Sequence, residues 1–187
     1  MMKFVVEHLE PELFGWCAIE YAHVAEMVGK ENVLFTNIPA KESAKLSSCG
    51  EVTEKKVSGL HLKKACILDP YARKTLSGSD KGKFGCLILG GILGNNPAEG
   101  RTEKLTGSLP YPTRNLGKKQ LSTDTAAYVA KRILEGRKLS EFHFVDEVEV
   151  QLGEGESMTL PFPYVLEDNK VVISEKLVEH LKRRKGF

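Results

Sequence analysis

The sequence predicts an α/β protein whose central sheet is mainly parallel and is flanked by helices. Short apolar segments typical of buried strands alternate along the chain with segments whose apolar residues recur at helical spacing. Strands that alternate with helices pair in parallel, because each helix returns the chain to the end of the sheet where the previous strand began. The length of 187 residues is that of one domain, with room for a small terminal appendage.

The first part of the chain supplies two predicted strands and a helix between them. Lys3–Glu7 reads as a buried strand, and Asn32–Thr36 as a second one. Between them, Glu12–Val28 has helical spacing, and Gly29 is the expected end of that helix. One face carries an apolar stripe and the other is polar, with Leu13, Cys17, Tyr21, Val24 and Val28 on the first and Glu12, His23 and Glu26 on the second.

Two further strands lie in the middle of the chain, among segments with a weaker pattern. Ala65–Leu68 and Gly85–Leu89 are short apolar runs typical of strands. Residues 41–63 are polar and give no firm prediction. Residues 95–121 are rich in Gly, Pro, Asn and Lys and read as one long connection, which in compact domains is usually functional.

The last third begins with a helix and ends in the appendage. Ser122-Thr123-Asp124 provides an N-cap and a first-turn acid for a helix over Thr125–Glu135, which Gly136 ends. Phe142–Val145 follows as a strand and completes a core of residues 1–146. We expect an appendage over residues 147–187, packed on that core, with short strands in Glu147–Leu152 and Pro163–Ile173 and a helix over Ser174–Arg184.

Composition narrows the class of protein. No apolar run approaches the roughly 18 residues that span a bilayer, and the start MMKFVVEHLE is not a signal peptide, so we expect no membrane partner. The cysteines lack metal-ligand spacing, so we expect free thiols, no metal site and a reducing, cytoplasmic compartment. The four are Cys17, Cys49, Cys66 and Cys86.

Charge is distributed unevenly, although the formal net charge is only +2. Residues 141–160 hold six acids and no Lys or Arg. Residues 101–119 hold one acid and five basic residues, Arg101, Lys104, Arg114, Lys118 and Lys119. Each segment is either a solvated face or a docking surface, the acidic one for a basic protein and the basic one for phosphate.

Three loops occupy the positions where open α/β sheets bind ligands, beyond the carboxyl ends of strands. They are Leu68-Asp69-Pro70, Gly90–Gly94 and Leu116–Leu121. Glycines let the backbone approach a flat ligand such as an adenine ring. Because GGILG lacks the G-x-G-x-x-G spacing and no Gly-Lys-Ser/Thr follows it, a phosphate cofactor is disfavoured.

Read in order, these motifs resemble those of the SPOUT methyltransferases. More narrowly, the chain resembles the branch containing the fungal enzyme that monomethylates an arginine of a small-subunit ribosomal protein, and more faintly the bacterial tRNA guanine methyltransferases. The resemblance covers nearly the whole chain apart from residues 41–63. It rests on EHLE…W…EY (7–21), ILDP (67–70), LGGILG (89–94), RTEKL (101–105), LGKKQLSTDTA (116–126) and PFPYVL (161–166).

The resemblance implies a deep trefoil knot in the C-terminal half of the sheet and S-adenosylmethionine as cofactor, without a metal. It places the bent cofactor in a cleft formed by the three loops, held largely by backbone atoms. On this basis the cofactor-binding residues are Leu68, Asp69, Pro70, Gly90, Gly91, Ile92, Gly94, Leu116, Gly117, Gln120, Leu121 and Thr123.

Methyl transfer needs an aligned nucleophile about 3–3.5 Å from the methyl carbon, with water excluded. An arginine guanidinium is charged at neutral pH, so a carboxylate that orients it and takes its proton is expected. We name Glu7, Arg101 and Asp124 as catalytic candidates, with Arg101 holding a carboxylate or phosphate group. The structural alternatives are a solvated arginine and a helix N-terminal acid.

Other carboxylates remain candidates. Glu10 follows the first strand. Glu20 lies at the margin of the apolar stripe, where a structural hydrogen bond is the alternative reading. Asp69 precedes Pro70 and could simply start a turn.

Three functions stay open from the sequence. The leading hypothesis is an enzyme that methylates an arginine of a ribosomal or other basic protein. The second is a tRNA or rRNA methyltransferase, because most of the class modifies RNA and the basic segment adjoins the ligand loops. The third is a non-catalytic ribosome-assembly or interaction module. Most SPOUT enzymes complete their site across a homodimer, whereas the branch that this chain resembles includes a monomeric enzyme. The sequence therefore leaves a monomer and a homodimer open.

Overall fold

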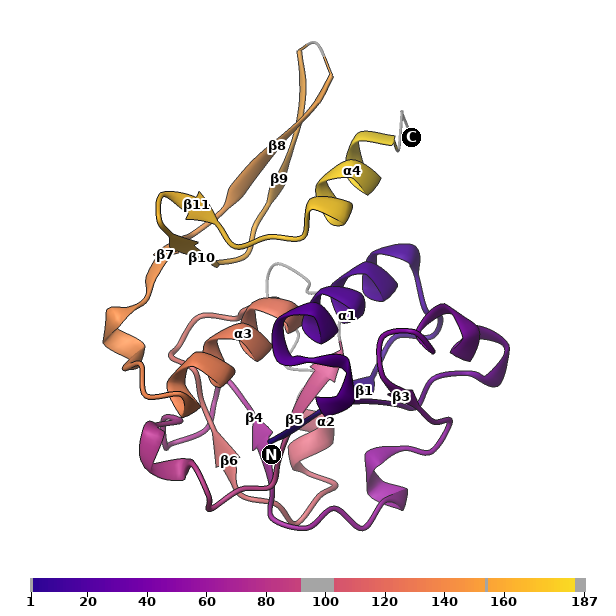
Figure 1. The fold of residues 1–187 in the computed structure, drawn as a ribbon, viewed down its shortest axis with the longest axis vertical. Helices are drawn as coiled ribbons and strands as arrows, with labels where there is room; N and C mark the ends of the chain where they lie inside the picture. The colour runs from indigo at the N-terminus through magenta and orange to yellow at the C-terminus, as the bar shows by residue number, and fades with distance from the viewer. Residues whose placement is uncertain (1, 92–102, 154, 184–187) are drawn as a thin grey trace.

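The computed structural model describes residues 2–91, 103–153 and 155–183, apart from the side chains of residues 103 and 104 (Figure 1). Its main sheet has the order β3-β2-β1-β5-β4-β6, and every neighbouring pair in it is parallel. The predicted α/β class with a mainly parallel sheet is confirmed. The strands are β1 (Lys3–His8), β2 (Val33–Thr36), β3 (Glu51–Val52), β4 (Ala65–Leu68), β5 (Cys86–Gly91) and β6 (Thr113–Arg114).

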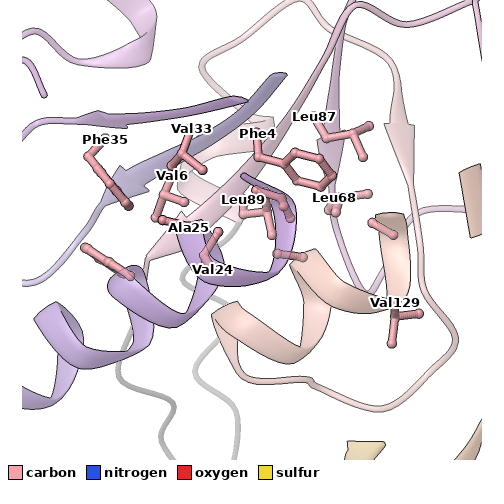
Figure 2. Close-up of a cluster of buried hydrophobic side chains, with 14 of the residues drawn as sticks. Phe4, Val6, Val24, Ala25, Val33, Phe35, Leu68, Leu87, Leu89 and Val129 are labelled. Atoms are coloured by element: carbon pink, nitrogen blue, oxygen red, sulfur yellow. The ribbon is translucent and has the colours of Figure 1, made fainter. Parts of the chain in front are cut away.

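Two helices, α1 (Gly15–Val28) and α3 (Thr123–Leu134), cover one face of this sheet. Side chains alternate along a strand, so Phe4 and Val6 of β1 point to that face while Val5 points to the other. Figure 2 shows the resulting core, in which side chains of the central strands meet those of the two helices. The predicted apolar stripe of α1 is buried there throughout.

The opposite face of the sheet packs against loops. Its buried cluster includes Val5, Ile67 and Ile88, and Val57 of a short 3-10 helix (Val57–Gly59) covers it. Val57 lies in the stretch 41–63, where no element was predicted. A further helix, α2 (Glu103–Thr106), and β6 interrupt the long connection expected over residues 95–121.

The C-terminal part forms antiparallel strands and one helix, seen at the top of Figure 1. A third apolar cluster lies here, and Trp16 and Ile19 of α1 pack against it. The elements are β7 (His143–Val145), β8 (Val148–Gly153), β9 (Glu156–Leu160), β10 (Tyr164–Glu167), β11 (Lys170–Val171) and α4 (Glu175–Arg183). Because β7 pairs with β10, strand pairing crosses the predicted boundary at residue 146, and the division into core and appendage stays a prediction.

Several element ends differ from the sequence-based expectation. The first helix begins at Gly15 rather than Glu12, because Glu42 accepts a hydrogen bond from the Leu13 backbone N–H and holds that residue outside the helix. The fifth strand runs to Gly91 rather than Leu89, because its pairing with β1 continues to His8. The third helix spans Thr123–Leu134 instead of Thr125–Glu135.

In the C-terminal part, β9 was not predicted at all. The segment Pro163–Ile173 contains two strands, joined at Asp168 and Asn169, whose φ angles of 48° and 59° are typical of a tight hairpin turn. Among the described residues, no helix is both long and apolar enough to cross a membrane. All four cysteines are free thiols, and Cys66 and Cys86 lie in the core.

Candidate active site

The order of the strands brings the described parts of the three predicted ligand loops to one edge of the sheet. Strands β5, β4 and β6 are neighbours and parallel, so their carboxyl ends lie side by side. The loop at Asp69 follows β4, Gly90 and Gly91 end β5, and the loop at Leu116–Leu121 follows β6. The Asp69 backbone N–H donates to the Arg114 carbonyl at 2.9 Å, which joins the first loop to the start of the third.

The first loop is a turn anchored by its own aspartate. The side chain of Leu68 is buried in the core, so Leu68 could reach a ligand only through its backbone. Asp69 is also buried, and its Oδ1 accepts the backbone N–H of Tyr71 at 2.9 Å. Asp69 therefore makes the turn that was the structural alternative for it, and Pro70 beside it stays partly exposed.

The second loop begins inside β5. The Thr123 hydroxyl donates to the Gly90 carbonyl at 3.4 Å, so the start of α3 contacts the beginning of the second loop. A Cβ at Gly91 would lie 2.0 Å from the Tyr21 hydroxyl oxygen, so any larger residue there would displace the tyrosine. The predicted site residues Ile92, Gly94 and Arg101 lie outside the described residues.

The third loop lines a pocket of about 170 Å³. Gly117 has a φ of 97°, in the left-handed region that favours glycine. Its N–H donates to Asn115 Oδ1 at 3.0 Å, which fixes the turn. Gln120 is partly buried and does not line the pocket. The lining residues are Leu116, Gly117, Lys118, Lys119 and Leu121 of the loop, together with Leu139 and Phe144, which the sequence analysis did not identify.

Asp124 lies at the start of α3, directly after the third loop, with 1% of its surface exposed. Its Oδ1 accepts the Ser122 hydroxyl at 2.6 Å and the Thr125 backbone N–H at 2.8 Å. Its Oδ2 lies 2.8 Å from Nδ1 of His23, and the imidazole donates because a carboxylate can only accept. The helical pattern placed His23 on the polar side of α1; the structure corrects this, since His23 faces α3 across the helix contact.

Glu20 of α1 is a second buried carboxyl group close to Asp124. Its Oε1 accepts the Trp16 indole N–H at 2.7 Å, the structural hydrogen bond considered for it. Burial raises the pKa of Glu20 well above its ordinary value, and the negative charge of Asp124 raises it further. A hydrogen bond from the Thr123 backbone N–H partly offsets that rise, so Glu20 also contacts the first residue of α3.

The carboxylate of Glu7 is buried, and one of its two oxygens accepts two hydrogen bonds. Its Oε2 accepts the Thr36 hydroxyl and, at 3.0 Å, the Val57 backbone N–H. Both bonds tie β1 to its neighbouring elements, and a catalytic role for Glu7 stays a prediction. His8, the next residue, forms a 2.9 Å hydrogen bond to the Tyr21 hydroxyl, and burial lowers the pKa of His8.

The basic and acidic segments differ in how free their charges are. Nε and Nη2 of Arg114 each donate to Asp80 at 3.0 Å, and the guanidinium lies over the Phe84 ring, so this arginine is not available to phosphate. Lys119 pairs with Asp146, and Lys118 is exposed. The described acids of the other segment are exposed, namely Glu141, Asp146, Glu147, Glu149 and Glu156.

Comparison with known proteins places this architecture. The sequence model of the family described as protein arginine N-methyltransferase SFM1-like matches residues 3–186. Protein arginine N-methyltransferase SFM1 of Saccharomyces cerevisiae is 31% identical over 202 residues, covering 97% of this chain and 95% of the yeast protein. The crystal structure of yeast SFM1 with SAH gives a TM-score of 0.87 at 30% identity, over 96% of this chain and 94% of that one.

The yeast SFM1 complex with SAM also gives a TM-score of 0.87, at 31% identity and over 97% and 90% of the two chains. Dual-specific Trm10 of Thermococcus kodakaraensis gives 0.60 at 14% identity, over 75% of this chain and 96% of that one, a likeness of fold alone. These matches confirm the predicted SPOUT-type fold. With the family model spanning almost its whole length, the chain belongs to the SFM1-like family of protein arginine N-methyltransferases.

Proposed function

We propose that this chain transfers a methyl group from S-adenosylmethionine to an arginine side chain of a protein. The observation that carries the proposal is the convergence of the three predicted loops at the edge formed by β5, β4 and β6, beside an apolar pocket. Membership of the SFM1-like family supports it, since its yeast relative has been crystallised with both SAM and SAH.

The pocket at the third loop fits the base of the cofactor. Leu116, Leu121, Leu139 and Phe144 give it apolar walls, as a flat heterocyclic ring requires, and loop backbone would supply hydrogen bonds to the ring edge. Its volume of about 170 Å³ is below the roughly 300–1,000 Å³ of complete ligand pockets, so it would hold only part of the molecule. The remainder would extend towards Gly90 and Thr123.

S-adenosylmethionine supplies a methyl group bound to a positively charged sulfur. The protein must then orient the arginine and remove its proton. Of the three catalytic candidates, Asp124 is best placed, because it adjoins Thr123, which contacts Gly90. The roles of Glu7 and Arg101 remain proposals from the sequence.

We propose a ribosomal or other basic protein as the methyl acceptor. The exposed acids of residues 141–156 support this, because they would attract a positively charged partner. An RNA substrate is less well supported, because Arg114 of the basic segment is already paired with Asp80.

The acceptor can be tested with labelled S-adenosylmethionine. We expect incubation with salt-washed small ribosomal subunits to place label on a protein arginine, identified by amino-acid analysis after acid hydrolysis. Label that appears only in the RNA fraction would refute the arginine assignment and favour the alternative.

Three finer features belong to the same proposal. A trefoil knot is supported by the strand order, because β6 follows β5 in the chain yet lies beyond β4, after which α3 returns to pack on β5. The four free thiols support a reducing, cytoplasmic location. A monomer and a homodimer are both compatible with the site, and sedimentation with and without cofactor distinguishes them.

A further inference from the structure

Gly91 is the last residue of β5 and the second residue of the loop Gly90–Gly94, which is proposed to hold the cofactor. It follows Leu87 and Leu89 on the face of the strand that packs against the helices, and it is buried. A Cβ on Gly91 would lie 2.0 Å from the hydroxyl oxygen of Tyr21 and 2.7 Å from Cζ of the same ring. Both distances are shorter than real Cβ contacts, so the tyrosine occupies the space over Gly91.

Tyr21 has little freedom to move away from Gly91. Its side chain comes from α1, and 1% of its surface is exposed. The ring stacks on Phe35 with a centroid distance of 5.4 Å, and the His8 ring lies nearly perpendicular to it at 5.9 Å. The hydroxyl oxygen lies 2.9 Å from Nδ1 of His8, in a buried hydrogen bond. The two ring contacts and this bond fix where the hydroxyl points.

His8 ties the same hydroxyl to the strand beside β5. It ends β1, where it is the register partner of Gly91, and the next residue, Leu9, donates its backbone N–H to the Gly91 carbonyl at 3.0 Å. Asn37 Nδ2 donates to the His8 carbonyl at 2.6 Å, which holds the end of β1 in place. The backbone of Gly91 is therefore fixed by β1 within the sheet and by Tyr21 from the helix side.

The neighbouring Gly90 is the residue placed to meet a ligand. Gly90 is partly exposed, whereas Gly91 is buried. The Gly90 carbonyl accepts the Thr123 hydroxyl at 3.4 Å, so the start of α3 reaches the same point of the chain. A shift of Gly91 would move Gly90 with it, because the two share a planar peptide bond. The position of Tyr21 thus controls the backbone beside the proposed cofactor cleft.

A role in the core alone does not account for the hydroxyl of Tyr21. Burial raises the pKa of Tyr21 well above its ordinary value, so the hydroxyl stays neutral. Burying it is costly without a hydrogen bond such as the one to His8. A phenylalanine would supply the same ring without that cost, but it would leave the space over Gly91 unfilled. The hydroxyl is therefore explained by the glycine that it supports.

We propose that Tyr21 is a positioning residue for S-adenosylmethionine. Its hydroxyl, oriented by His8, supports the backbone of Gly90 and Gly91 in the conformation that receives the cofactor. Tyr21 acts through the loop and does not touch the reacting atoms. This inference rests on the proposed function and adds to its cofactor site a residue that was predicted only as part of the apolar stripe of α1.

The first test removes the hydroxyl and keeps the ring. For Tyr21→Phe we expect the Kd for SAH, measured by calorimetry, to rise about five- to tenfold, the equivalent of one hydrogen bond. The KM for S-adenosylmethionine should rise by a similar factor. The kcat at saturating cofactor should stay within about twofold of the wild-type value, because the loop regains its position once the cofactor is bound.

Tyr128→Phe is the matched control. Tyr128 lies on α3, and its hydroxyl is bonded to Glu167 rather than placed against a ligand loop. Loss of this hydroxyl should lower the free energy of unfolding, measured in urea, while the Kd for SAH stays within about twofold of the wild-type value. A general loss of stability therefore does not imitate the effect expected for Tyr21→Phe.

A second test adds the methyl group that Tyr21 excludes. Gly91→Ala should raise the Kd for SAH at least about tenfold, because the tyrosine must move. In the Tyr21→Phe background the new methyl group meets a ring carbon at 2.7 Å in place of the oxygen at 2.0 Å, so the rise in Kd should be at least about threefold smaller. An equal rise in both backgrounds would show that Tyr21 does not set the requirement for glycine, which overturns the proposal.

The outcomes separate the two proposals. If wild-type protein binds SAH and labels arginine while Tyr21→Phe binds SAH as tightly, the positioning role is wrong and the proposed function stands. Equal losses of SAH affinity in Tyr21→Phe and Tyr128→Phe overturn the positioning role as well. These two comparisons decide the question even if Gly91→Ala does not fold. If wild-type protein neither binds SAH nor labels arginine, the proposed function itself fails.

Discussion

Asp80 and Glu20 are both buried carboxyl groups, yet their surroundings act on them in opposite directions. Burial alone would raise the pKa of Asp80, but two hydrogen bonds and the charge of Arg114 lower it below its ordinary value. At Glu20, burial and the charge of Asp124 both raise the pKa. The comparison teaches that the pKa of a buried acid follows its neighbours, because a bonded arginine lowers it whereas a second acid raises it.

The largest expected effect is the removal of the internal cation. Arg114→Met leaves Asp80 buried and unpaired, which should lower the free energy of unfolding by about 3–5 kcal/mol. Urea unfolding measures the loss. The double variant Asp80→Asn/Arg114→Met should recover most of it, and a loss under about 1 kcal/mol in the single variant would show that the pair is not structural.

A smaller loss is expected when the bond between His23 and Asp124 is removed. His23→Ala removes one of the three hydrogen bonds that Asp124 accepts and should lower the free energy of unfolding by about 1–3 kcal/mol. The same urea titration measures it, with His23→Gln as the control because its amide can still donate. Unchanged stability in His23→Ala would mean that Asp124 does not depend on this bond.

The pH dependence should have opposite signs at the two sites. Because the pKa of Glu20 is raised in the folded protein, its contribution to stability is fully present below about pH 4.5. That contribution is lost as the pH rises towards the pKa of the folded state. Glu20→Gln should therefore gain on wild type by up to about 1.4 kcal/mol per pH unit across that window.

Asp80→Asn is the matched comparison. The pKa of Asp80 is lowered in the folded protein, so its contribution to stability is fully present above about pH 3.8. That contribution is lost as the pH falls below this value. The stability difference between wild type and Asp80→Asn should shrink in acid. If the free energies of unfolding of Glu20→Gln and Asp80→Asn, each relative to wild type, changed with pH in the same direction, the opposite pKa shifts at the two sites would be contradicted.

The smallest effect is expected at an exposed ion pair. Lys119 and Asp146 are both largely in solvent, so Lys119→Met should change the free energy of unfolding by less than about 1 kcal/mol. Thermal unfolding at low and high salt measures it. A larger loss would show that exposure does not separate this pair from the buried Asp80–Arg114 pair.

The parts of the fold set by local sequence were predictable. β4 was predicted to the residue, because its apolar run is bounded by lysines and by Asp69-Pro70. The two-residue strands β3 and β6 were missed, since only their pairing with β2 and β4 makes them strands. The extension of β5 to Gly91 likewise depends on β1.

The site divides in the same way. Gly117 was named from the resemblance of LGKKQLSTDTA (116–126), which ends the long connection and leads into a predicted helix, and its positive φ is one that favours glycine. Leu139 and Phe144 reach the pocket only through the return of the chain after α3, which no local pattern reports. The bond from His23 to Asp124 joins residues 101 positions apart, and helical periodicity gave the opposite orientation for His23.

A crystal structure of the protein with SAH bound tests the central claim most directly. It should place the adenine ring in the pocket between Leu116–Leu121, Leu139 and Phe144, with the sulfur near Thr123 and directed towards Glu20 and Asp124. An adenine ring bound elsewhere, or a sulfur directed away from Asp124, would contradict the proposed site.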